Sequence, residues 1–163
     1  MIINYICVST ILIGVILYAY SIYKECKTKK YSMSFQASID LANLPIVTFY
    51  QGNKKYNFLL DTGTMGNIID SNCNIIHTPT EGGSIITGAA GDTIQATYSH
   101  LVLYYKDLKF ETETQVTDMS KPFKTLKENT GVTLHGLLGT DFFRDYGYIL
   151  DYYNMIAYPK KRK

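Results

Sequence analysis

The chain of 163 residues is 46% apolar, which suits one domain of ordinary size with a short appendage. Its net charge of +2 gives no electrostatic case for a nucleic-acid-binding protein. Its three cysteines are irregularly spaced and form no CxxC pair, so neither a zinc site nor a disulfide framework is predicted.

The first predicted element is a membrane anchor over residues 1–23. Ile2 to Tyr23 carry no charge, and such a run forms a helix of about 33 Å, which matches a bilayer core of roughly 30 Å. A cleaved signal peptide is the main alternative, but no Lys or Arg precedes the apolar run and residues 18–21 make a poor cleavage site. A buried core helix is the other alternative, and the length of the uncharged run disfavours it.

A basic linker is predicted at residues 24–34. The positive-inside rule then predicts a single-pass membrane protein whose globular domain, residues 35–158, faces the cytoplasm. Residues 159–163 form a second basic group, interpreted as a solvated tail, with contact to anionic lipid headgroups as the alternative. The lysines that set the predicted topology are Lys24, Lys27, Lys29 and Lys30.

The globular part begins with patterns typical of short β-strands. Phe35, Ala37 and Ile39 alternate with polar neighbours, which predicts a half-buried strand. Two further apolar runs, 45–50 and 56–60, flank a turn signal and predict a hairpin that leads into Asp61.

The rest of the chain is predicted to continue as strands with one helix. Thr140 is expected to cap a short helix that ends at Gly147. Residues 119–131 are polar and are expected to form a loop. Strands are expected at residues 84–87, 93–98, 101–105, 108–116, 134–138, 148–150 and 155–158, and the last two are expected to form a hairpin around the turn at 151–154.

The strongest candidate for chemistry is the tripeptide Asp61-Thr62-Gly63, directly after an apolar strand. Alone it is weak evidence, because Asp and Gly are common turn residues and such a triplet occurs by chance in roughly a few per cent of chains this long. Its context strengthens a functional interpretation: Thr64 follows, a glycine-tipped hairpin comes later, and a Leu-Leu-Gly element precedes the predicted helix.

This order of motifs resembles the retropepsin-like family of aspartic proteases, the single-domain retroviral type. The resemblance spans about Leu44 to Tyr158. Each motif alone is unspecific, and together they are fairly specific. They are FLLDTGT at residues 58–64, IITGAAGDTI at 85–94 and GLLGTDFFRDYGYILDYYNMIAY at 136–158.

The resemblance implies an all-β fold, a closed antiparallel β-barrel of the acid-protease type with one short C-terminal helix. It implies an aspartic endopeptidase that cleaves protein or peptide substrates as a homodimer, because one DTG triplet must pair with a second. Two carboxylates in contact cannot both ionise easily, so one acts as general base on a water and the other hydrogen-bonds the scissile carbonyl. Asp61 would play both parts, one in each subunit. Neither a cofactor nor a metal is implied.

The resemblance also implies supporting roles. Thr62 is expected to hydrogen-bond across the dimer, Gly63 to let backbone N–H groups approach the carboxylate, and Thr64 to donate to its outer oxygen. Two further groups are a flap over a bound peptide and a support beneath the active-site loop, made of Gly88, Ala89, Ala90 and Gly91, and of Leu137, Leu138 and Gly139.

Three features depart from the family's pattern. Thr140 stands where retroviral members usually have an arginine paired with an acid. The flap tip is Ala-Ala where many members have more glycine, and a C-terminal strand that interleaves at the dimer interface is not evident before the lysine-rich tail. The dimer is therefore expected to be held differently or weakly.

Other residue types offer weaker sites. The three histidines, His77, His100 and His135, lie far apart in no metal-binding pattern, and neither a GxSxG motif nor a GxxxxGK[ST] loop occurs. Two rival hypotheses remain open. In the first, the domain keeps the fold but is a catalytically silent, membrane-bound binding or assembly module. In the second, it is an unrelated β-domain in which DTG is only a turn.

Overall fold

The computed structural model describes residues 12–23, 31–88, 91 and 93–160. The chain divides into two compact units, Met1–Ser32 and Met33–Lys163. In the first unit, residues 12–23 form a helix with exposed side chains. No helix within the described residues is long and apolar enough to cross a membrane. Parts of the predicted anchor, linker and tail lie outside the described residues, namely 1–11, 24–30 and 161–163.

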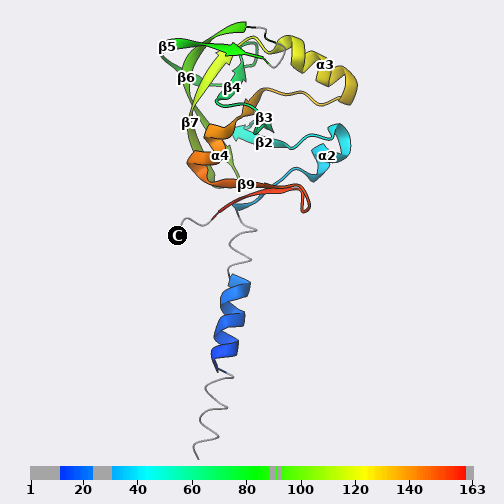
Figure 1. Ribbon diagram of the computed structural model, residues 1–163, viewed down its shortest axis with the longest axis vertical. Coiled ribbons are helices and arrows are strands. Elements are labelled where there is room, and N and C mark those ends of the chain that lie inside the picture. The colour runs from blue at the N-terminus through cyan, green and yellow to red at the C-terminus, as the bar shows by residue number, and fades with distance from the viewer. Residues whose placement is uncertain (1–11, 24–30, 89–90, 92, 161–163) are drawn as a thin grey trace, which may run out of the picture. The chain divides into compact units, whose positions relative to one another are not determined.

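The second unit is built mainly of strands (Figure 1). The predicted hairpins are confirmed, since β2 pairs with β3, β5 with β6 and β9 with β10. In chain order the elements are β1 (Met33–Ser34), α2 (Gln36–Ala42), β2 (Ile46–Gln51), β3 (Lys54–Leu60), β4 (Asn67–Asp70), β5 (His77–Thr87), β6 (Thr93–Tyr105), β7 (Leu108–Thr117), α3 (Ser120–Thr130), β8 (Gly136–Leu138), α4 (Thr140–Tyr146), β9 (Tyr148–Asp151) and β10 (Ile156–Pro159).

Six strands close into a barrel in the order β2-β3-β8-β4-β7-β6, and a pairing between Tyr50 of β2 and Tyr104 of β6 completes the ring. The closed β-barrel confirms the predicted class. Two pairings depart from the predicted antiparallel arrangement, because β3 pairs with β8 and β4 pairs with β7 in parallel. Parallel neighbours need long connections, so these pairings join segments far apart in the sequence that no local pattern relates.

A second, three-stranded sheet joins the two ends of this unit. β10 lies between β1 and β9 and is antiparallel to both. The Phe35 N–H donates to the Met155 carbonyl at 3.0 Å, and Met33 and Phe35 are almost fully buried. The last residues of the predicted linker are therefore part of the fold.

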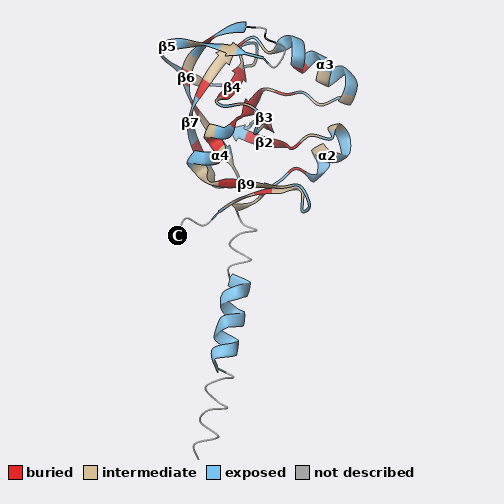
Figure 2. Ribbon diagram, viewed as in Figure 1, coloured by how far each residue is buried: buried red, intermediate tan, exposed pale blue. Residues whose placement is uncertain are grey.

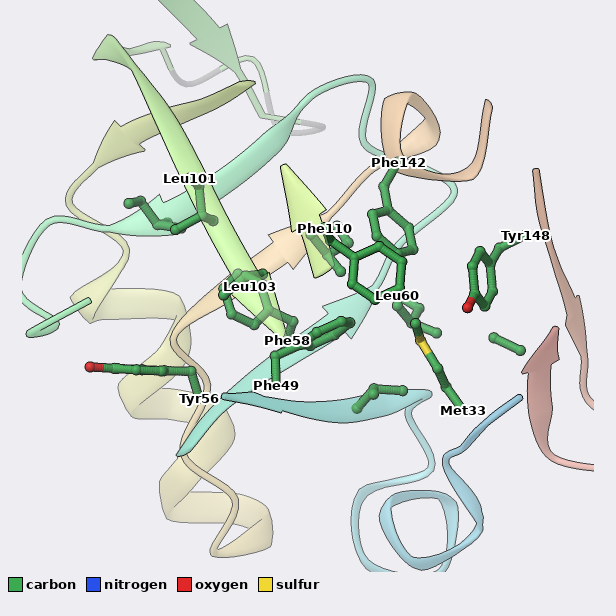
Figure 3. Packing of buried hydrophobic residues seen from close by; sticks show 14 of the residues in the cluster. Met33, Phe49, Tyr56, Phe58, Leu60, Leu101, Leu103, Phe110, Phe142 and Tyr148 are labelled. Atoms are coloured by element: carbon green, nitrogen blue, oxygen red, sulfur yellow. The ribbon is translucent and has the colours of Figure 1, made fainter. Parts of the chain in front are cut away.

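Aromatic and aliphatic side chains form the core together, and the buried residues lie mostly on the strands (Figures 2 and 3). Phe49 packs edge-on against Phe58, Phe110 and Phe142, with ring centroids 5.7, 5.8 and 6.3 Å away. Edge-to-face contacts of this kind are the arrangement that ring quadrupoles favour. Because Phe142 comes from α4, this packing holds that helix against the barrel.

Two helices occupy segments that were predicted to have other structures, so the second unit has three described helices and not one. α2 replaces the strand predicted from Phe35, Ala37 and Ile39. Phe35 and Ile39, four positions apart, both contact the core while Ala37 is exposed, which fits a helix. α3 replaces the predicted loop at 119–131, and its buried Phe123 packs on the core.

The predicted C-terminal helix is present as α4, with a correction at its first residue. Gly139 is the N-cap, and the Thr140 hydroxyl does not cap the helix but donates to the Met65 carbonyl at 2.9 Å. Gly147 ends the helix at a φ of 65°, in the left-handed conformation that suits glycine.

His135 joins the segment before β8 to β3 through two hydrogen bonds. Its backbone N–H donates to the Asn57 carbonyl at 2.9 Å, and its ring Nδ1 accepts from the Asn57 N–H at 3.0 Å. Desolvation lowers the pKa of His135 below its ordinary value, while the Asn57 backbone and the Asp70 charge offset part of that effect.

We expect this imidazole to make stability fall in acid. The folded chain binds this proton less readily than the unfolded chain, so the contribution is present above the unfolded pKa of about 6.5 and is lost as pH falls through the folded pKa. In His135→Asn the amide oxygen can accept the same N–H without titrating. In urea unfolding of the full chain, the free energy of unfolding of the parent should fall by about 1 kcal/mol more than that of this variant as the solution is acidified. Parallel pH profiles would contradict the prediction.

Candidate active site

Asp61 stands at the end of β3, where the chain leaves the core. Tyr56, Phe58 and Leu60 are buried in alternation along the strand. The Asp61 N–H donates to the Leu138 carbonyl at 2.9 Å, which extends the parallel pairing of β3 with β8 by one residue. The barrel thus holds the backbone of Asp61 although its side chain belongs to a loop.

Both oxygens of the Asp61 carboxylate are held by the loop that follows. The Gly63 N–H donates to Oδ1 at 2.8 Å, and the Thr64 hydroxyl donates to Oδ2 at 2.7 Å. A Cβ at Gly63 would lie 3.2 Å from Oδ1, so glycine permits the close approach of this backbone. These are the contacts predicted for Gly63 and Thr64, and they fix the plane of the carboxylate.

The outer surface of the loop is exposed in the single chain. Asp61 and Thr64 are half-buried, while Thr62 and Gly63 are exposed and the Met65 side chain is 83% exposed. The Met65 carbonyl accepts hydrogen bonds from Thr140 and Asp141, so the exposed side chain extends from a fixed backbone. An exposed apolar side chain beside a fixed carboxylate offers a surface that a second molecule can cover.

The first turn of α4 is hydrogen-bonded to the loop that follows Asp61. The Thr140 N–H donates to the Thr64 carbonyl at 2.8 Å, and the Asp141 N–H donates to the Met65 carbonyl at 3.0 Å. Helix N–H groups at this end have no partner within the helix, so the loop supplies their acceptors. The loop and the helix therefore form one hydrogen-bonded unit.

The predicted support lies directly beneath the loop. Leu137 and Leu138 of β8 are buried, and the backbone of Gly139 is so close that a Cβ there would lie 2.3 Å from the Gly66 carbonyl oxygen and 2.6 Å from that of Thr64. The structure thus brings the DTG loop and the Leu-Leu-Gly element into contact.

The predicted flap falls at the tip of the β5–β6 hairpin. Its last register pair is Thr87 with Thr93, and the Gly91 N–H donates to the Gly88 carbonyl at 2.9 Å. Ala89 and Ala90 lie outside the described residues. Ile86, near the tip, packs against the small core cluster that contains Leu137, so the hairpin and the support share apolar contacts.

Asn67, at the start of β4, belongs to the site although the sequence did not predict it. Its side chain is 2% exposed and accepts from the Gly139 N–H at 3.0 Å. The same amide donates to the Thr112 hydroxyl at 2.6 Å and to the Glu113 carbonyl at 3.1 Å. The one available signal was an amide side chain directly before the apolar pair Ile68-Ile69.

The other candidate residues stay apart from this site. His77 hydrogen-bonds the buried Ser99 hydroxyl at 3.0 Å, and His135 serves strand packing as described above. Burial raises the pKa of the Cys73 thiol, which disfavours a reactive thiolate. Within the described part of the chain, no three His, Cys, Asp or Glu side chains are placed to hold a metal ion.

The similarity of this chain to known proteins is found among solved structures. No family model matches the chain, and no curated protein matches it. Among solved structures, the chain is similar to the EIAV protease complexed with the inhibitor HBY-793, at 18% sequence identity and a TM-score of 0.43. The match covers 64% of this chain and 88% of that protease. A functional assignment therefore has to rest on the residues of the site.

Proposed function

We propose that this chain is an aspartic endopeptidase that acts as a homodimer on protein or peptide substrates. The observation that carries the proposal is the Asp61 carboxylate, with both oxygens held by the Gly63 N–H and the Thr64 hydroxyl in an exposed loop. An aspartate that only caps a turn needs one such bond. Here β8 and α4 also hold the loop, so its geometry is fixed beyond what a turn requires.

A second carboxylate must come from a second chain. In the described residues, no other acidic side chain is bonded to the Asp61 carboxylate. A two-fold axis beside the exposed loop would place the same surface of two copies face to face, as isologous dimers do. Thr62 and Met65 lie on this surface, so both would be covered in the dimer.

In this dimer the two carboxylates share one proton, because like charges in contact cannot both ionise easily. The ionised Asp61 takes a proton from a water, whose oxygen attacks the scissile carbonyl carbon. The protonated Asp61 hydrogen-bonds the carbonyl oxygen and gives it a proton. The tetrahedral intermediate then collapses: the second carboxylate takes back the proton of one hydroxyl as the carbonyl forms again, the C–N bond breaks, and the leaving amine takes the proton held by the first carboxylate.

The test is cleavage of a mixed peptide library by the full chain from acid to neutral pH, with the association state followed by sedimentation. We expect cleavage only at concentrations where the dimer is populated. A stable dimer that cleaves nothing across this pH range would overturn the protease proposal and favour the binding or assembly module.

We also propose that residues 1–23 anchor the enzyme in a membrane, with the barrel on the cytoplasmic side. The uncharged run from Ile2 to Tyr23 supports this, as does the exposure of apolar side chains on the helix at 12–23, such as Leu17 at 63%. The lysines that follow support the orientation. A reporter fused after Lys163 should be active only in the cytoplasm. An N-terminus cleaved after the apolar run would indicate a signal peptide instead.

A further inference from the structure

The side chain of Asn67 is a buried polar group that the proposed reaction does not use directly. It is 2% exposed, and its hydrogen-bond partners are Thr112 and Glu113 of β7 and Gly139, the residue after β8. A buried amide is costly unless its hydrogen bonds are made, so its presence between apolar strands needs a physical reason.

One peptide unit links Asn67 to Asp61. The Gly139 N–H donates to Asn67 Oδ1 at 3.0 Å, and the Leu138 carbonyl of the same peptide unit accepts from the Asp61 N–H at 2.9 Å. A peptide unit is planar and stiff, so its N–H and C=O cannot turn independently. An acceptor that fixes the N–H of this unit therefore also fixes the carbonyl that holds the backbone of Asp61.

The other end of the Asn67 amide is anchored in β7. Nδ2 donates to the Thr112 hydroxyl at 2.6 Å and to the Glu113 carbonyl at 3.1 Å. These two acceptors determine which amide atom faces which partner, so Oδ1 must face Gly139. The strand β7 thereby sets the orientation of a peptide unit that lies beneath the DTG loop.

We propose that Asn67 is a positioning residue for Asp61, acting through the Leu138–Gly139 peptide unit, a role that rests on the proposed function. Loss of this contact lets the peptide plane turn and the Asp61 backbone move with it. A displacement on the order of 1 Å at a catalytic group can lower turnover about 100-fold. Substrate contacts elsewhere are untouched, so kcat should fall while KM stays nearly constant.

Asn67→Asp keeps the shape of the side chain and tests the role by pH. When the introduced carboxyl is protonated, it can still donate to the Glu113 carbonyl and accept from the Gly139 N–H. When it is ionised, an anionic oxygen faces the Glu113 carbonyl oxygen, so the hydrogen bond that anchors this side chain to β7 is lost and the side chain is repelled from that strand. We expect kcat about 10-fold to 100-fold below the parent near neutral pH and recovery toward the parent in acid.

Two threonines of β7 provide a matched pair of further variants. Thr112→Val removes one acceptor of the Asn67 amide. Thr114→Val alters a second buried threonine of β7 whose hydroxyl, within the described part of the chain, donates only to the Gln115 carbonyl, at 3.5 Å. We expect Thr112→Val to lower kcat and Thr114→Val to leave it unchanged. If kcat falls equally in the two variants, in proportion to the stability that each loses, the positioning role is overturned.

Amide hydrogen exchange of the full chain provides a readout that needs no activity. The Asp61 N–H should exchange faster in Asn67→Asp and Thr112→Val, relative to the Leu60 N–H, which donates to the Pro45 carbonyl at 2.9 Å and serves as the internal reference. If the parent cleaves no peptide, the proposed function fails while this measurement still decides whether Asn67 holds Asp61. An unchanged ratio of the two exchange rates would overturn the inference even if the parent is an active protease.

Discussion

Asp61→Asn is expected to lower peptide cleavage about 1,000-fold or more while the barrel and the dimer persist. An amide can neither take a proton from water nor give one to the carbonyl oxygen. It can still accept from the Gly63 N–H, and the Thr64 hydroxyl can rotate to accept from the new NH₂ group, so the loop should keep its geometry. The measurement is turnover of a library peptide that the parent cleaves, with sedimentation of both proteins.

Mixing the two proteins tests whether each subunit supplies one carboxylate. With free exchange of subunits, a nine-fold excess of Asp61→Asn leaves only about a tenth of the parent subunits in parent homodimers, so activity should fall to about a tenth. If one chain carries the whole site, the added variant will leave activity unchanged. That outcome would reject the shared dyad even if the single substitution abolishes cleavage.

Gly139→Ala is expected to cost about 3 kcal/mol or more of the free energy of unfolding. The new Cβ would lie 2.3 Å from the Gly66 carbonyl oxygen and 2.6 Å from that of Thr64, and both are backbone atoms held in place by hydrogen-bonded neighbours. The conformation of Gly139, with φ −85° and ψ −169°, is open to any residue, so the cost comes from crowding alone. Thermal unfolding should show a fall in Tm of about 10 °C.

Gly66→Ala is the matched control because it adds the same methyl group on the opposite side of this contact. The nearest atoms to its Cβ belong to the flexible Gln115 side chain, at 3.6 Å or more. Its Tm should stay within a few degrees of the parent's, about what a surface substitution costs. Similar losses in both variants would indicate that the loop tolerates no side chain at all, and the crowding argument would fail.

Local patterns in the sequence predicted the parts of the fold that form between close neighbours. The hairpins β2–β3 and β9–β10 were predicted because a turn signal stands between two apolar runs, and the end of α4 was predicted from Gly147. The two missed helices were harder to recognise. Phe35, which precedes α2, and Ile39 within it both contact the core, a spacing that also fits a strand, and α3 is polar on most of its surface.

The residues of the candidate site were likewise predictable only where their contacts are local in the sequence. Asp61 and its bonds to Gly63 and Thr64 lie within four consecutive residues, so the sequence could indicate them. Asn67 contacts Thr112 and Gly139, and the barrel brings these residues together only through the parallel pairings β4–β7 and β3–β8. A single sequence contains no local signal for such contacts, which arise from the tertiary fold.

The short strand β1 limits where the chain can be cut without loss of the barrel. Met33 and Phe35 are 0% and 1% exposed, and removing a buried Met or Phe side chain costs roughly 2–5 kcal/mol. Two such losses approach the whole stability of an ordinary domain. Proteolytic release of an intact barrel must therefore occur upstream of Met33, so a fragment that keeps the fold would begin at or before Met33.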